Sequence, residues 1–385
     1  MRKIYLIRPI QWVMIFTLFW ISLQATQAAT LNVCSTCTYT TIADAITAAS
    51  TINVDTIAVA AGAYPEDITI GKSLILQGAG AATTTISGAG AASIITITAS
   101  TVKIDGFTIT NAASTYGIKV ANQSHISITG NTIHHVKAFG IAVSSTTAIV
   151  DDVTITNNMI RDITSSTAQS AEGIVIGFST GVKDINSLLI QGNTISNISC
   201  TSTKGAYGIH LNHAIGGVGN TGCTVSPQIL NNTISNLNGV WAHGIGLEGC
   251  TPYALVQGNQ IQISSVNATA AAPLSAPGTD AIAVMLEDNA SANTVMIVSN
   301  SFTGGSYGVF NKTASNPAVT VGSNWWNCTA GANGGGGCAA TYPTTGANAV
   351  TTGVPCTSPS CTVSAPIIDL RSSGRATIFA TEIIE

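Results

Sequence analysis

The sequence contains few charged residues and few aromatic residues. Asp, Glu, Lys and Arg make up 8% of the 385 residues, and Phe, Trp and Tyr make up 5%, whereas an average soluble domain is about 25% charged. The 13 basic residues are outnumbered by 17 acidic ones, which argues against a nucleic-acid-binding protein. Hydrophobic residues make up 45%, which argues against disorder. A β-rich protein with a polar, mostly uncharged surface remains, and a helical cytosolic enzyme is disfavoured by the same composition.

The first residues have the pattern of a secretory signal peptide over residues 1–28. Three basic residues among the first eight precede the apolar run Trp12–Leu23, and Ala28 follows at the distance of a cleavage site. An uncleaved anchor is disfavoured, because the run is shorter than the ~20 residues that a membrane span needs. Removing three basic residues from 13 leaves 10 against 17 acidic ones, a net charge of −7. We expect a secreted, extracellular or cell-surface protein whose mature chain does not insert into a membrane.

Nine cysteines in an exported chain indicate disulfides rather than thiol catalysis or a metal site. Three pairs are close enough in sequence to form local bridges: Cys34 with Cys37, Cys328 with Cys338, and Cys356 with Cys361. Cys200, Cys223 and Cys250 remain, so one of these three stays free or pairs outside the chain. We predict no metal ion and no cofactor.

Two short strings of residues recur along the chain. The first places an asparagine two residues before an apolar residue, at Asn131, Asn158, Asn193, Asn232 and Asn259, with weaker copies at Asn300 and Asn324. The second, x-Gly-Ile, begins at Tyr116, Phe139, Glu172, Tyr207 and His243, and in degenerate form at Asp280 and Tyr307. The segments between them have short-strand patterns and no helical periodicity. These repeats therefore indicate a β-solenoid and exclude the helical solenoids.

The repeated residue types fit the coils of such a solenoid. Strands of successive coils lie ~4.8 Å apart, and alternate residues face a narrow interior that β-branched Ile and Val suit. Gly and Asn tolerate the left-handed backbone of the turns. Asparagines in the same turn of successive coils can stack and hydrogen-bond through their amides. We therefore interpret the first six asparagines, from Asn131 to Asn300, as a structural ladder rather than as catalytic residues.

The two ends of the repeat region have different patterns. Thr41–Ala49 has apolar residues at helical spacing, which predicts a short helix that caps the open strand edges. Residues 328–385 begin with a stretch rich in Gly, Thr, Pro and Cys, which indicates a loop-rich, disulfide-rich C-terminal cap or a linker. The predicted fold is all-β, with the solenoid over residues 29–327.

A family resemblance supports this fold. Tyr39–Gly88, followed by Val102–Ile109, resembles the opening of the pectin-lyase-like right-handed parallel β-helix proteins, and the later strings resemble their parallel β-helix repeats. The resemblance covers roughly residues 38–327 and implies a right-handed parallel β-helix. It implies no single activity, because that superfamily includes lyases, hydrolases, epimerases, esterases, adhesins and binding proteins.

The strand that carries x-Gly-Ile is the predicted ligand-binding surface, because loop insertions flank it on both sides and loops of this kind carry function. The residue before each glycine forms a column whose aromatic members suit stacking on sugar rings: Tyr116, Phe139, Tyr207 and Tyr307. A second set, His210, His213, Trp241, His243 and Glu248, is the most chemically varied cluster in the sequence. The alternatives are that the aromatics stack only for stability and that most histidines are solvated surface groups.

An enzyme is the competing interpretation of the same surface. Ala242-His243-Gly244-Ile245 resembles the Gly-His-Gly signature of polygalacturonase-like glycosidases, and the strings at Glu172 and Asp280 loosely resemble their Asn-Thr-Asp-Gly-Ile signature. The resemblance implies catalytic roles for His243, Asp280 and Glu172. The paired aspartates and the Arg-Ile-Lys element are missing. A net charge of −7 also disfavours an acidic polymer as the substrate.

The sequence thus favours a protein that binds a largely neutral polysaccharide or glycoconjugate, in an adhesion or matrix role, over a glycoside hydrolase or polysaccharide lyase. It leaves the sugar and the oligomeric state open. Cys223 and Cys250 each lie nine residues before a ladder asparagine, Asn232 and Asn259. Equal offsets place them ~4.8 Å apart, which a disulfide accepts, so we predict this bridge and leave Cys200 unpaired.

Overall fold

The computed structural model describes residues 27–90, 92–177, 185–212, 224–249, 251–263, 281–287, 294–305, 307–312, 317–326, 340–342 and 350–352. Residues 1–26 of the predicted signal peptide and nearly all of the predicted C-terminal cap lie outside this set, so the domain boundaries stay predictions. In the described part of the chain, no helix is long and apolar enough to cross a membrane.

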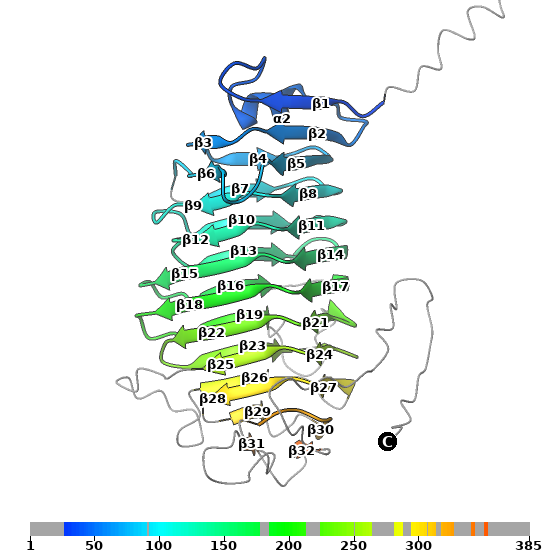
Figure 1. The fold of residues 1–385 in the computed structure, drawn as a ribbon. Helices are drawn as coiled ribbons and strands as arrows, with labels where there is room; N and C mark the ends of the chain where they lie inside the picture. Colours follow the sequence, from blue (N-terminus) through cyan, green and yellow to red (C-terminus); the bar gives the residue numbers. More distant parts are fainter. Residues whose placement is uncertain are drawn as a thin grey trace, which may run out of the picture.

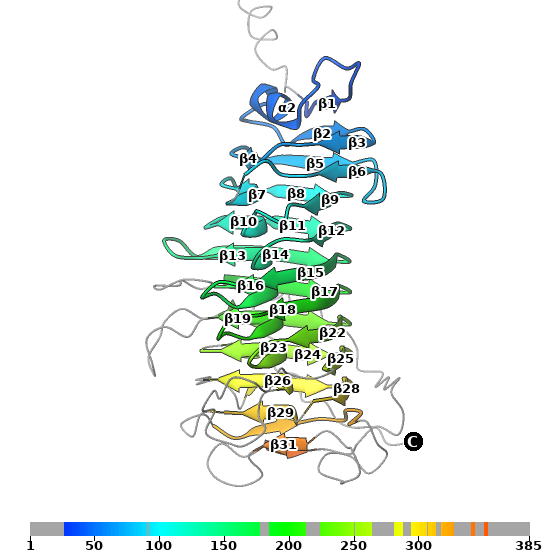
Figure 2. The same ribbon diagram turned by 90° about the vertical axis from the view of Figure 1, so that its left-hand side faces the viewer.

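The described chain folds into parallel strands that stack coil upon coil in three long sheets (Figures 1 and 2). The strands of sheet A are β1 Thr30–Val33, β2 Asp55–Val59, β5 Leu74–Gly78, β8 Val102–Asp105, β11 Ile126–Thr129, β14 Val150–Thr156, β17 Ile185–Gln191, β20 Thr224–Val225, β21 Gln228–Leu230, β24 Leu255–Gln257 and β27 Met296–Val298.

The other sheets take the remaining strands of each coil. The strands of sheet B are β3 Gly62–Tyr64, β6 Thr84–Ile86, β9 Thr108–Thr110, β12 Thr132–His134, β15 Met159–Ser165, β18 Thr194–Cys200, β22 Thr233–Asn238, β25 Gln260–Ile263 and β28 Ser301–Gly304. The strands of sheet C are β4 Ile68–Ile70, β7 Ser93–Ile97, β10 Tyr116–Ala121, β13 Phe139–Ser144, β16 Ala171–Ile176, β19 Ala206–Asn212, β23 Ala242–Glu248, β26 Ala281–Glu287, β29 Tyr307–Asn311 and β31 Ala340–Tyr342. A separate pair joins β30 Val319–Val321 to β32 Val350–Thr352.

Each strand pairs in register with its counterpart in the next coil. Ile141 of β13 faces Ile174 of β16, and Ile174 faces Ile209 of β19. Side chains at such positions fill one continuous core of buried, mostly β-branched residues that runs the length of the described coils. This architecture is the parallel β-helix that the repeated strings predict.

Asparagines hydrogen-bond in a buried column between sheets A and B. The side chains of Asn131, Asn158, Asn193, Asn232, Asn259, Asn300 and Asn324 form it, each Nδ2 donating to the Oδ1 of the next member at 2.9–3.1 Å. Each backbone N–H but the last donates to that same oxygen. Each Nδ2 also donates to a backbone carbonyl, as Asn193 does to Ile155.

The residue before each member of this column makes the turn. Its backbone is left-handed in six successive coils, with φ between 53° and 68° at Gly130, Asn157, Gly192, Asn231, Gly258 and Ser299. Glycine and asparagine are the residues that adopt this conformation most readily. The two residues therefore have different roles: the first makes the turn, and the second forms the buried hydrogen bonds.

A short helix, α2 Ile42–Ala48, lies at the first coils and packs against β1, β2 and β4 (Figures 1 and 2). Ile42, Ala45 and Ile46 are buried, in agreement with the helical spacing of the sequence. Glu66 accepts hydrogen bonds from the backbone N–H groups of Ile42 and Ala43. Asp55 accepts from Ala29 and Ser50, and these bonds lower its pKa despite burial.

The structure joins Cys34 to Cys37 in a disulfide. Cys200 is buried and has no disulfide partner in the described part of the chain. Its Sγ lies 3.5 Å from the carbonyl oxygen of Gln169 and 3.2 Å from Ser202 Oγ. Cys223, Cys250, Cys328, Cys338, Cys356 and Cys361 lie outside the described residues.

The bridge between Cys223 and Cys250 therefore stays a prediction. We expect a non-reduced proteolytic digest to contain a peptide that joins these two cysteines, and mass spectrometry with and without reduction checks it. The bond between Cys34 and Cys37 serves as the internal control in the same digest. A peptide that links Cys200 to either Cys223 or Cys250 would contradict the prediction.

Candidate functional site

The candidate site lies on the outer face of sheet C. His210 on β19 stands between Ile209 and Leu211, which both belong to the core, so its side chain points outward. The glycine of each x-Gly-Ile string lets neighbouring coils approach closely here. A Cβ atom on Gly140 would lie 2.5 Å from the carbonyl oxygen of Gly173 and 2.6 Å from Ile160 Cγ2, too close for either contact.

The predicted column is in register through five coils, differs from the prediction in the sixth, and agrees with it again in the seventh. Paired residues run Tyr116, Phe139, Glu172, Tyr207, His243, Ile282 and Tyr307. The partner of His243 is Ile282, so the prediction that Asp280 stands in this column is wrong. Ala283 takes the place of the glycine, because a Cβ on Gly244 would meet the carbonyl oxygen of Ala283 as other glycines meet their counterparts.

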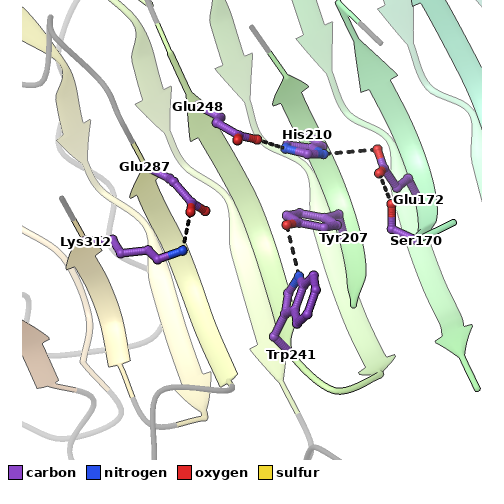
Figure 3. A network of polar contacts seen from close by, with 8 residues as sticks. All are labelled: Ser170, Glu172, Tyr207, His210, Trp241, Glu248, Glu287 and Lys312. Carbon is purple, nitrogen blue, oxygen red and sulfur yellow. Dashed lines mark hydrogen bonds and ion pairs between the residues drawn. The ribbon is translucent and has the colours of Figure 1, made fainter. Parts of the chain in front are cut away.

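Six side chains from successive coils form what we call the polar cluster: Glu172, Tyr207, His210, Trp241, His243 and Glu248. Its centre is His210, whose two ring nitrogens each meet a carboxylate (Figure 3). Nδ1 lies 3.2 Å from Glu172 Oε2, and Nε2 lies 2.9 Å from Glu248 Oε2. Ser170 donates a short hydrogen bond to the other oxygen of Glu172. Glu172 and His210 are 2% and 4% exposed, so this is a buried ion pair.

Aromatic rings hold the histidine in place. The ring of Tyr207 stacks on that of His210, with centroids 4.0 Å apart and planes 3° apart. Trp241 Nε1 donates a 2.9 Å hydrogen bond to the hydroxyl of Tyr207. Gly205 makes room for this indole, because a Cβ there would lie 2.0 Å from Trp241 Nε1. The orientation of His210 is therefore set by two hydrogen bonds and one stacked ring.

The environment separates the pKa values of the two histidines. Burial disfavours a charged His210, but the charges and hydrogen bonds of Glu172 and Glu248 outweigh it and raise the pKa to about 10. His210 is therefore an imidazolium at neutral pH, and both ring N–H groups donate. Burial lowers the pKa of His243 well below 6.5, and the positive charges of His210 and Lys312 lower it further. His243 is therefore a neutral imidazole.

His243 is also the unsatisfied member of the polar cluster. Its ring meets the edge of Tyr207, with centroids 5.0 Å apart, and it is 2% exposed. Neither Nδ1 nor Nε2 has a hydrogen-bond partner among the described residues. Most buried polar groups in proteins are paired.

Charged and apolar residues surround the polar cluster on the same face. Glu287 of β26 pairs in register with Glu248 and forms an ion pair with Lys312, and all three side chains are partly exposed. Above the cluster, Phe139 is fully buried with Ala138, Ala142 and Val175, and Tyr116 stacks on it at 5.1 Å. Below, Tyr307 packs with Ile282, Met285 and Phe310.

The structure brings Glu172, Tyr207, His210, Trp241, His243 and Glu248 together, and it places Tyr116, Phe139 and Tyr307 in the flanking apolar groups. Asp280 and His213 lie outside the described residues, as do 178–184, 213–223 and 264–280 of the predicted flanking loops. Ser170, Glu287 and Lys312 were missed. Glu287 could have been found, because it follows Ile282 by five residues, as Glu248 follows His243. Among the described residues, no three His, Cys, Asp or Glu side chains gather as metal ligands.

The protein is a parallel β-helix with a cluster of hydrogen-bonded polar side chains on the outer face of sheet C. A family model described as a right handed beta helix region matches residues 92–273. The described part of the chain is thus a parallel β-helix, and residues 92–273 are similar to the right handed beta helix region of that family model.

Several solved structures are similar to the chain at low identity. An alginate lyase from Paenibacillus sp. str. FPU-7 is 14% identical, with a TM-score of 0.35, over 85% of this chain and 99% of that one. The pectin methylesterase from Aspergillus niger is 11% identical, with a TM-score of 0.36, over 79% and 86%. Pectin methylesterase PemA from Erwinia chrysanthemi is 12% identical, with a TM-score of 0.34, over 84% and 92%. Likeness at this level says nothing about activity. No curated protein matches the chain.

Proposed function

We propose that this chain is a secreted or cell-surface protein that binds a largely neutral polysaccharide along the outer face of sheet C, in an adhesion or matrix role. The polar cluster carries the proposal. Its charged, hydrogen-bonding and aromatic side chains converge on successive coils of a chain that is only 8% charged. Sugar sites combine such rings with a few well-placed polar groups.

The charges favour a neutral ligand. Glu172 and Glu248 share one cation, His210, so the polar cluster has a net charge of −1. Glu287 and Lys312 beside it cancel each other. A uronate polymer would meet no excess of positive charge among these residues, and like charges repel it.

One observation favours an enzyme as the second candidate. The carboxyl groups of Glu172 and Glu248 lie on opposite sides of the His210 ring, 3.2 Å and 2.9 Å from its two nitrogens, and inverting glycosidases likewise hold two carboxyl groups ~6.5–9.5 Å apart. His210 occupies the space between them and hydrogen-bonds to both. We therefore keep glycoside hydrolysis or polysaccharide lysis on this face, with Glu172 and Glu248 as the two carboxyl groups, as the alternative.

A panel of neutral and acidic polysaccharides separates the two functions. We expect affinity electrophoresis to show retardation by at least one neutral polymer, with no new reducing ends and no unsaturated-uronate absorbance after long incubation. Chain cleavage that is lost in Glu172→Gln or His243→Ala would contradict a binding-only role. Absence of binding to every polymer would contradict the proposed function.

A further inference from the structure

An exposed, uncharged patch lies on the outer face of sheet A. It spans the neighbouring strands β21, β24 and β27 (Figure 1), none of which contains a charged residue. Tyr253, two residues before β24, is 66% exposed, and Met296 of β27 is 51% exposed. Among the exposed large hydrophobic residues of the described chain, Tyr253 is the one aromatic residue. Contiguous exposed apolar surface marks interaction sites, whereas isolated apolar residues do not.

The strand pairing places five residues side by side in what we call the sheet A patch: Gln228, Tyr253, Leu255, Gln257 and Met296. Leu255 pairs with Gln228 in the coil before and with Met296 in the coil after. Gln257 follows Leu255 by two residues, so both are on one face, and both are partly exposed, as is Gln228. From the spacings within and between strands, the patch is roughly 13 Å by 10 Å, which is enough to hold a sugar ring.

The fold does not account for a large ring at Tyr253. Its backbone is left-handed, with a φ of 58°, a conformation that is unfavourable for bulky residues. The ring is mostly exposed, so little burial compensates for this strain. The corresponding position of the five preceding coils is also left-handed, with φ between 51° and 59°, and holds smaller, polar side chains: Thr101, His125, Asp152, Ser187 and Ser226.

Hydrogen bonds to both neighbouring coils hold this turn in place. The backbone N–H of Tyr253 donates to Thr294 Oγ1 at 3.0 Å in the coil after. The carbonyl oxygen of Pro252 accepts from the backbone N–H of Ser226 at 2.9 Å in the coil before. The exposed ring is therefore carried by a fixed backbone, and binding to it orders little of the chain.

We propose that the sheet A patch is a second subsite for the neutral polysaccharide, in which the ring of Tyr253 stacks on the face of a sugar ring. This inference rests on the proposed function for the class of ligand. The C–H groups of a sugar face suit the ring, and the amides of Gln228 and Gln257 offer both donors and acceptors to hydroxyl groups. Because the three strands are uncharged, a uronate gains no ion pair from them. Tyr253 follows Glu248, the last residue of β23, by five residues, so the patch adjoins the outer face of sheet C.

A ring that serves the ligand and a ring that serves the fold predict opposite effects of Tyr253→Asn. Asparagine tolerates the left-handed backbone, as Asn157 and Asn231 do in this chain, so we expect an unchanged or higher melting temperature. We expect the affinity for a neutral polymer to fall about tenfold, because the aromatic contact is lost. Tyr253→Phe keeps the ring and should bind within about threefold of the wild type. The matched control is Ser187→Asn, at the same turn position two coils earlier.

Affinity electrophoresis of the four proteins in galactomannan, xyloglucan, arabinan and polygalacturonate measures binding, and thermal denaturation measures stability. The inference expects a neutral polymer to retard wild type, Tyr253→Phe and Ser187→Asn more than Tyr253→Asn, at equal or higher stability of Tyr253→Asn. Equal affinities of wild type and Tyr253→Asn would overturn the inference and leave the proposed function standing. If no neutral polymer retards the wild type, the proposed function and the inference both fail.

Three further outcomes would also overturn the inference. A lower melting temperature of Tyr253→Asn would assign the ring to the fold. A loss of affinity in Tyr253→Phe as large as in Tyr253→Asn would exclude stacking as the contact. Light scattering that finds a wild-type dimer and a Tyr253→Asn monomer, at equal polysaccharide affinity, would identify a second copy of the chain as the occupant of the patch.

Discussion

Replacing Asn193 by leucine is expected to lower the free energy of unfolding by about 3–5 kcal/mol. Asn193 lies in the middle of the buried column, where its Oδ1 accepts from the backbone N–H and the side chain of Asn158. Leucine has a similar size but accepts nothing, so it leaves a buried backbone donor unpaired and removes several further hydrogen bonds. An unpaired buried donor lowers stability by about 1–3 kcal/mol, and each lost bond by about 0.5–1.5 kcal/mol.

Urea denaturation followed by circular dichroism measures this effect. The matched control is Asn236→Leu, because Asn236 donates to Asn197 at 3.2 Å on the exposed surface. We expect the control to lower the free energy of unfolding by about 1–2 kcal/mol, mostly from the strain of leucine in a left-handed backbone with a φ of 54°, which is still less than the effect expected for Asn193→Leu. Equal effects of the two variants would contradict a special role for the buried column.

Replacing His210 by leucine is expected to destabilise the fold by about 3–5 kcal/mol at pH 7, because removing one partner of a buried ion pair leaves an uncompensated charge. The stranded charge is Glu172, whose side chain is 2% exposed, whereas Glu248 is partly exposed. The control His125→Leu removes an exposed histidine that lies 3.6 Å from Asp152. Such a surface pair contributes about 0–1 kcal/mol.

The difference between wild type and His210→Leu should also depend on pH. In the wild type, the pKa of His210 is raised to about 10 from an unfolded value of 6.5, so its contribution is complete below pH 6.5 and is lost as the pH rises through about 10. The difference in unfolding free energy should therefore be largest near pH 6 and should shrink steadily between pH 6.5 and pH 10. Denaturation across this range checks it, and a difference that does not vary with pH would contradict the ion-pair explanation.

The sequence predicts the coils because every coil repeats the same local chemistry. The strings around Asn158 and Gly173 each mark one turn or one strand, and their spacing sets the register. The string at Asp280 fails for a physical reason: the glycine position of that coil holds Ala283, so a search for x-Gly-Ile stops two residues too early. A small residue satisfies the same close approach, and only pairing with β23 distinguishes the two registers.

The sequence predicts which residues form the candidate site, but it does not predict that they are buried or how they contact one another. Periodicity places His210 and His243 on the outer face, where a histidine is expected to be solvated, yet both are buried. Burial depends on what covers the face, and no repeated string carries that information. The link between Glu172 and Glu248 through one imidazole likewise depends on the stacking of three coils. The repeated strings give the order of these coils, but they do not give the directions in which the outer side chains point.

The asparagine column also has a direction. From Asn131 to Asn300, each side chain donates to the next asparagine on the C-terminal side, and each of these contacts ends on the Oδ1 of that next residue, so the side-chain carbonyl dipoles point the same way and polarise one another. The column begins where the backbone N–H of Phe107 donates to Asn131 Oδ1, and coils before it continue without an asparagine. Removing coils from the N-terminal side would leave the Oδ1 of the first remaining asparagine short of donors and one of its Nδ2 hydrogens without its backbone acceptor. Removing them from the C-terminal side would leave both a backbone N–H and an Nδ2 hydrogen of the last remaining asparagine without acceptors, and buried N–H groups tolerate this less often than carbonyls do. Deleting coils is therefore expected to lower the stability of the β-helix less at its N-terminal end than at its C-terminal end.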